Sequence, residues 1–171
     1  SMGVSLRMDR QDLPYKDIRV RQALTMATNF DDIVNNYYKG DAAKIAWPVT
    51  PGKVTEAAYW PFETLPQSVK DLYTYNPTKA KQLLTEAGYP NGFKSKIVIQ
   101  NTSALVDLMS IVKDQLSKVG VDMEIQPKDA GTYSSIGSNR SYEDMYLRSL
   151  PSDLNNTVYM STLLGEGLFN I

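Results

Sequence analysis

The chain lacks two residue types that carry much of protein chemistry, because its 171 residues include no cysteine and no histidine. Thiol nucleophiles, zinc sites built from these residues and catalytic triads with a histidine base are therefore excluded. Without cysteine there are no disulfides to indicate a redox compartment. A Gly-rich phosphate loop is also missing, since the Gly88–Gly92 spacing follows a predicted helix and lacks the lysine.

An excess of charge of one sign and long apolar runs are missing as well. The formal net charge is -1, which offers no basic face to nucleic acid. No apolar stretch approaches the roughly 20 residues that a membrane helix needs. Neighbouring acids such as Asp31–Asp32 and Glu143–Asp144 diverge on a helix or strand and form no acid–base pair. We therefore predict that the chain is not an enzyme and has no cofactor or metal site.

Tyrosine dominates the aromatic residues, with 11 Tyr against 4 Phe. These tyrosines can form an ordinary half-exposed surface, or an amphipathic wall for a ligand or a protein partner. The second interpretation supports one alternative function, a free-standing protein-interaction domain with a Tyr-rich surface.

The strongest structural pattern lies between residues 95 and 129. Residues 96–100 are β-branched and apolar, as in a buried strand, and residues 121–125 alternate as in a strand with one buried face. Between them, apolar residues recur at helical spacing, with Ser103 as the predicted cap and Gly120 as the stop. Short turns join these segments, so we predict a right-handed βαβ unit with parallel strands in an α/β fold.

Caps and apolar stripes predict the other elements. Asp17 caps a helix that buries Val20, Ala23, Leu24 and Ala27, Asn29 caps a second helix that ends at Gly40, and Asn76 caps a third that ends at Gly88. Residues 5–14 are expected to be an edge strand or a connecting ribbon, and residues 41–65 a long loop. Weaker patterns predict helices over 67–73, over 130–138 and from Val158 onward, and a strand over 142–147.

Three blocks of this chain resemble the bacterial extracellular solute-binding proteins of family 5, the binding components of ABC importers for oligopeptides, dipeptides, nickel and related solutes. They are LPYKDIRVRQAL at 13–24, YNPTKAKQLLTEAGYPNGF at 75–93, and QLSKVGVDMEIQ at 115–126. The chain departs from the family pattern at residues 28–30 (TNF), where Ile-Asp-Arg is usual. It departs again at Ser149-Leu150, where Gly-Trp is usual.

The resemblance implies a single α/β lobe, residues 5–171, of a periplasmic-binding-protein type II-like fold with a mixed sheet, a central βαβ unit and flanking helices. Residues 1–4 are interpreted as a tag remnant. Family members close two lobes around a ligand like a hinge, and this chain matches only the C-terminal lobe. The expected partners are therefore a small peptide or related solute, the missing N-terminal lobe and ABC permease subunits. The expected location is extracellular or periplasmic, with a lipid anchor on the full-length protein left open.

The resemblance also implies ligand contacts in this lobe. Asp153 would pair with a positive group such as a peptide amino terminus, although it can equally be a helix cap. Ser152 lies beside it in a predicted turn and is included as a candidate. Arg148 is either an anion partner or a solvated strand end. Trp47 and Trp60 either stack on the ligand or pack over the sheet.

Overall fold

The structure is a computed structural model that describes residues 2–44 and 59–149. Its centre is a four-stranded mixed sheet in the order β1-β4-β2-β3. The strands are β1 (Met2–Leu6), β2 (Phe93–Gln100), β3 (Val121–Lys128) and β4 (Met145–Ser149). β4 is parallel to β2 and β2 is parallel to β3, whereas β1 is antiparallel to β4. The α/β class and the mixed sheet are thus confirmed.

The predicted βαβ unit is present. β2 and β3 are parallel neighbours whose register runs from Phe93 opposite Val121 to Gln100 opposite Lys128. Helix α5 (Ser103–Ser117) connects them and packs on both strands. The predicted cap is wrong by one residue, because Thr102 takes that place and its Oγ1 accepts from the Leu105 N–H at 3.3 Å. Thr102 has extended backbone angles, as an N-cap requires, whereas Ser103 is already helical.

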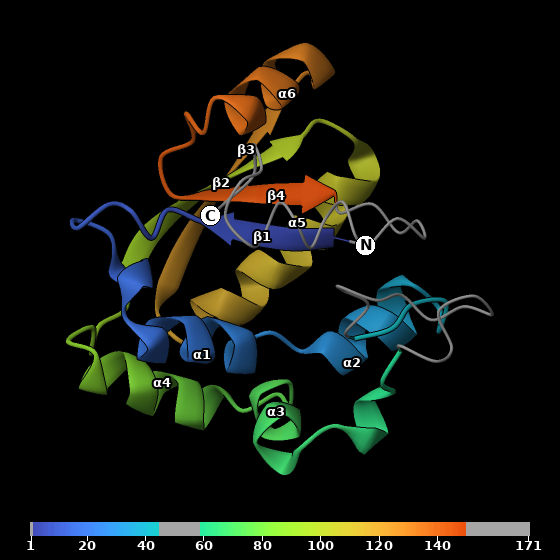
Figure 1. Ribbon diagram of the computed structural model, residues 1–171, viewed down its shortest axis with the longest axis vertical. Coiled ribbons are helices and arrows are strands. Elements are labelled where there is room, and N and C mark those ends of the chain that lie inside the picture. Colours follow the sequence, from blue (N-terminus) through green and yellow to red (C-terminus); the bar gives the residue numbers. More distant parts are fainter. Residues whose placement is uncertain (1, 45–58, 150–171) are drawn as a thin grey trace.

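The main core lies between one face of the sheet and three helices (Figure 1). Helix α5 covers β2 and β3, α1 (Ile18–Ala27) packs against α5, and α4 (Pro77–Glu86) packs against α1. Two short helices, η3 (Phe62–Thr64) and α3 (Gln67–Leu72), precede α4 in the chain. The most deeply buried large side chains in this core are Tyr15, Val20, Leu84, Ile97, Ile99, Val121 and Met123.

A smaller core lies on the opposite face of the sheet, where Figure 1 shows α6 (Ala130–Ser138) above the strands. Val98, Tyr142 and Tyr146 are buried there, with Tyr133 and Ile136 of α6 packed against them. The strand predicted over 142–147 begins later, at Met145. Tyr142 is buried before the strand starts, so its apolar contact comes from a loop and not from sheet pairing.

The arginines of the 13–24 block bind backbone carbonyl groups. Asp17 caps α1 by accepting from the Arg19 N–H at 2.8 Å, which confirms the predicted cap. The Arg19 guanidinium forms an ion pair with Asp17 at 2.6 Å. It also donates to the carbonyl of Glu86, the last residue of α4, at 2.7 Å. Arg21 donates to the Tyr15 carbonyl at 2.7 Å. The block therefore joins two helix ends.

The glycines of the second and third blocks meet in space. Gly92, just before β2, and Gly120, just before β3, both have positive φ values, of +72° and +87°. A Cβ atom on Gly92 would lie 1.9 Å from the Gly120 carbonyl oxygen. Only glycine allows the two turns to approach this closely, so these residues set the starting point of the β2–β3 register.

The edge strand β1 covers only residues 5 and 6 of the segment 5–14, for which an edge strand or a connecting ribbon was predicted, and residues 7–13 connect it to the 3₁₀ turn Pro14–Lys16. The tag interpretation of residues 1–4 stays a prediction, yet residues 2–4 are paired with β4 as part of β1. Arg7, just after β1, donates to the carbonyls of Arg140 and Tyr142, each at 2.8 Å. In the described part of the chain, no helix combines the length and the apolar character needed to cross a membrane.

Candidate functional site

The three parallel strands end at one edge of the sheet, which we call the carboxyl edge. β2 ends at Gln100, β3 at Lys128 and β4 at Ser149. The chain leaves β2 toward α5 on one face and leaves β3 toward α6 on the other. In open α/β sheets, ligands bind beyond the carboxyl ends of strands where neighbouring connections diverge in this way. The carboxyl edge is therefore the candidate site.

A row of side chains crosses this edge on the face covered by α6. The registers place Gly3 opposite Arg148 and Gln100 opposite Lys128. In the β2–β4 register, Val98 is opposite Tyr146. Two residues further along each strand, Gln100 is therefore level with Arg148. Arg148 is half-buried. The predicted anion partner thus lies at the carboxyl edge, one residue before the end of β4.

Helix α6 holds β4 in place through stacked tyrosines. The rings of Tyr133 and Tyr146 stack with centroids 4.6 Å apart. The Tyr146 hydroxyl donates to the Tyr133 carbonyl at 3.1 Å, and the Tyr133 hydroxyl donates to the Leu147 carbonyl. Burial raises the pKa of Tyr146, and the nearby charge of Arg148 opposes that rise. These contacts fix the strand that carries Arg148.

Two helices begin at the carboxyl edge, and each is capped by a side chain. Asp129 accepts from the N–H groups of Gly131 and Thr132, each at 3.0 Å, and so caps α6. Hydrogen bonds, first from the Thr132 hydroxyl and then from backbone N–H groups, lower the pKa of the Asp129 carboxyl. The Asn101 N–H donates to the Lys128 carbonyl at 2.7 Å, which ties the two connections together. The edge is therefore a fixed backbone frame.

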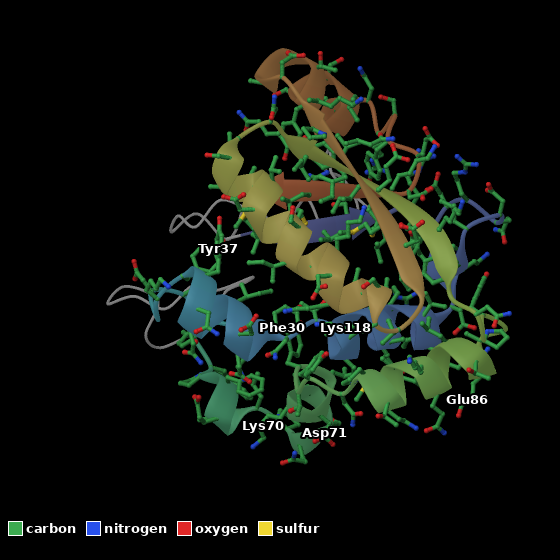
Figure 2. The ribbon with its side chains drawn as sticks, turned by 180° about the vertical axis from the view of Figure 1, so that it is seen from behind. Phe30, Tyr37, Lys70, Asp71, Glu86 and Lys118 are labelled. Atoms are coloured by element: carbon green, nitrogen blue, oxygen red, sulfur yellow. The ribbon has the colours of Figure 1, made fainter. Side chains whose placement is uncertain are left out.

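A tyrosine that the sequence pattern assigned only to a helix face also reaches this edge. After α1, the chain forms α2 (Phe30–Asp32) and then η2 (Ile33–Tyr37), a π-helical turn. The Tyr37 hydroxyl donates to the Ala104 carbonyl in the first turn of α5, at 2.5 Å. Figure 2 shows Tyr37 between this segment and α5. The spacing of Ile33, Tyr37 and Tyr38 also fits the apolar side of a regular helix, so it did not reveal the π turn.

Of the other predicted site residues, only Trp60 lies in the part of the chain that the structure describes. Trp47, Ser152 and Asp153 lie outside the part of the chain that the structure describes, as does the helix predicted from Val158. Trp60 has 67% of its surface exposed and leads into η3. Its role as a ligand-stacking wall stays a prediction.

A groove of about 590 Å³ lies elsewhere, between α5, the start of α2 and the segment before α4. It contains Lys118, which Figure 2 labels at the opposite end of α5 from Tyr37. The buried Gln115 in its wall uses its amide internally, accepting from the Asn29 N–H at 2.9 Å. The described residues contain no cluster of three or more acids suited to a metal ion. We therefore keep the carboxyl edge as the candidate site.

Comparison with known proteins defines the class. Residues 1–168 match the family described as bacterial extracellular solute-binding proteins, family 5 Middle. The chain belongs to this family, whose members are solute-binding proteins and not enzymes.

Individual proteins extend this result. The glutathione-binding protein GsiB of Pectobacterium atrosepticum is 31% identical over 127 residues, which are 74% of this chain and 23% of that protein. The periplasmic binding protein DppA from Helicobacter pylori, solved with the peptide STSA, has a TM-score of 0.71 and 28% identity over 93% of this chain and 29% of its own. AgaA from A. tumefaciens R10, solved with agropinic acid, has a TM-score of 0.69 and 22% identity over 91% of this chain and 30% of its own. The last likeness concerns the fold alone. The chain thus spans less than a third of each of these three proteins.

Proposed function

We propose that this chain is a substrate-capture lobe of an ABC importer binding protein that takes oligopeptides or dipeptides. The observation that carries the proposal is the family match over residues 1–168, on a fold whose carboxyl edge presents Arg148. A cation at this place suits the carboxylate of a peptide, since charge-assisted hydrogen bonds to carboxylates are among the strong ones.

Two related proteins support the peptide class. DppA from Helicobacter pylori was solved with the peptide STSA, and GsiB is named for glutathione, which is itself a tripeptide. Asp153 and Ser152 would meet the ligand's amino terminus, and Trp47 and Trp60 would stack on its side chains. We assign these four roles as part of the proposal.

The remaining partners follow from the size of the chain relative to its relatives. It covers 23% of GsiB and 29% of the DppA chain, so the rest of the receptor would include the N-terminal lobe that closes the cleft. ABC permease subunits would receive the loaded receptor. The receptor would work in the periplasm or outside the cell, with or without a lipid anchor.

The Tyr-rich interaction domain has less support. The structure describes ten of the eleven tyrosines, and every one of the ten is buried or half-buried. Tyr15 is fully buried, with its hydroxyl hydrogen-bonded to Ser95. Tyr142 and Tyr146 lie in the core beneath α6. Of the ten described tyrosines, three are thus buried inside the lobe and seven are half-buried, which leaves less tyrosine surface for a partner.

The test is calorimetry with a panel of dipeptides to pentapeptides on two proteins, the full-length receptor and this chain alone. We expect binding by the full-length receptor and little or none by the chain, because one open wall cannot bury a ligand as a closed pocket does. Unrelated anions and sugars serve as negative controls. A full-length receptor that binds no peptide, or binds a sugar instead, would refute the peptide assignment.

A further inference from the structure

Tyr37 and Tyr38 lie at the end of a helical turn that is wider by one residue than a turn of α-helix. The Tyr38 N–H donates to the Ile33 carbonyl, five residues earlier, at 3.0 Å. In a regular α-helix, a side chain five positions later would point about 140° away. The wider turn returns Tyr38 to the side of Ile33, where Tyr37, four positions later, lies in either kind of helix. Both pack against the main core, and their rings meet edge-on with centroids 4.8 Å apart. Single π turns of this kind often occur at functional sites.

The position of the hydroxyl is set by this ring packing. Tyr37 is half-buried, and its ring lies against the core. Its hydroxyl is therefore presented to the Ala104 carbonyl by a rigid side chain with few rotatable bonds. Residues 101–104, which are the turn after β2 and the first two residues of α5 and are called the 101–104 turn below, thus have two tethers. One is the Asn101 bond to β3, and the other is the Tyr37 bond to an element outside the sheet.

This turn borders the place where the chain leaves β4. The β2–β4 register, extended from Val98 opposite Tyr146, puts Asn101 level with Ser149. Neighbouring strands lie about 4.8 Å apart. A shift of the turn by even one ångström therefore changes the spacing between two walls of the proposed ligand site.

We infer that Tyr37 is a positioning residue for ligand binding, which acts by holding the 101–104 turn in its binding-competent place. The inference rests on the proposed function and adds a residue to it. One hydrogen bond changes an equilibrium between two arrangements by roughly two- to tenfold. The apparent affinity then falls by the loss in the fraction of receptor that is competent.

The experiment uses the full-length receptor with Tyr37→Phe, and Tyr38→Phe as the matched control. Both variants keep a ring on the core, but only the first removes the bond to Ala104. Association and dissociation rates are measured by stopped flow with the peptide Ser-Thr-Ser-Ala and with the panel peptide that the wild type binds most tightly. Hydrogen exchange of the 101–106 amides is measured without peptide.

We expect Tyr37→Phe to lower the association rate about two- to tenfold while the dissociation rate stays within twofold, because fewer receptors are competent but the bound state is unchanged. Exchange at residues 101–106 becomes faster, and Tyr38→Phe changes neither quantity. A purely structural role would lower the unfolding midpoint without changing the association rate.

Three results would overturn the inference in different ways. If the wild type binds peptide and Tyr37→Phe associates with it at the same rate, the tether has no effect on capture. A raised dissociation rate alone would show that Tyr37 touches the ligand directly. If the wild type binds no peptide, the proposed function fails, whereas unchanged exchange in Tyr37→Phe shows separately that the tether is not there.

Discussion

The close approach of Gly92 and Gly120 allows a sharp test of how this lobe sets its strand register. Replacing Gly92 with alanine adds a Cβ atom 1.9 Å from the Gly120 carbonyl oxygen, where an ordinary contact begins at 3.4 Å. The two turns must therefore separate by about 1.5 Å. Because these turns lead directly into Phe93 and Val121, the first register pair of β2 and β3 is displaced.

Gly88→Ala is the matched control. Gly88 also has a positive φ, +92°, but a Cβ there meets no atom within 4 Å. An alanine in this region costs about 1–2 kcal/mol of conformational strain, partly offset by about 0.4–1 kcal/mol from the stiffer unfolded chain. We expect Gly88→Ala to lose about 1 kcal/mol of unfolding free energy. Gly92→Ala adds an overpacking cost of about 1–3 kcal/mol or more.

The measurement is urea denaturation of the 171-residue chain, followed by far-UV circular dichroism and checked by thermal melting. For a chain of this size, each 1 kcal/mol lowers the melting temperature by about 2–4 °C. Gly92→Ala should therefore melt several degrees below Gly88→Ala. Equal losses in the two variants would refute the account, since strain alone would then explain both.

Three other changes test the core, the buried acid and the ligand pair. Leu116 has a side chain that is only 4% exposed, so Leu116→Ala should lower the free energy of unfolding by about 2–5 kcal/mol. Lys113→Ala, on the exposed face of the same helix, should change it by no more than about 0.5 kcal/mol. Similar losses in the two variants, measured by denaturation, would mean that the helix face is misassigned. Burial raises the pKa of Asp144 above 3.8, although its carboxylate accepts from the Lys96 N–H at 2.8 Å. The folded state then binds this proton more tightly, so stability from this group falls as pH rises from about 3.8 through the folded pKa. Asp144→Asn keeps an acceptor oxygen and should gain stability relative to wild type between pH 3 and pH 7, and a relative loss in denaturation curves would contradict this. In the full-length receptor, Asp153→Asn should weaken peptide binding by about 2–5 kcal/mol if the pair of Asp153 and the peptide amino terminus is desolvated. In this chain alone, the same change should have almost no effect. If calorimetry finds the full-length variant unaffected, Asp153 is only a helix cap.

Local patterns in the sequence were enough to predict most helices and the central βαβ unit. The predicted caps Asp17, Asn29 and Asn76 each cap a helix with a side-chain oxygen, as their residue types favour. The spacing of apolar residues located the buried faces of α1, α4 and α5 because apolar side chains at helical spacing share one face. Short connections allowed β2 and β3 only a parallel, right-handed crossover.

From the sequence, Arg148 was either an anion partner or a solvated strand end, and its role as an anion partner stays a prediction. The sequence did not predict Tyr37, because its hydroxyl acts on Ala104, which is 67 residues away. Contacts at such separation leave no periodic trace in the chain. The start of β4 at Met145 was missed for a related reason, since Tyr142 is buried by α6 and so imitates a strand residue.

The sequence by itself therefore determined where helices begin and which of their faces are buried, because caps and periodicity act within a few residues. Tertiary structure alone decided the order β1-β4-β2-β3, the antiparallel edge strand and the contact between Gly92 and Gly120. It also buried Tyr15, Tyr142 and Tyr146, although the number of tyrosines suggested a surface for partners. These features depend on which distant segments compete to cover the same apolar face, and that competition is settled only when the whole lobe packs.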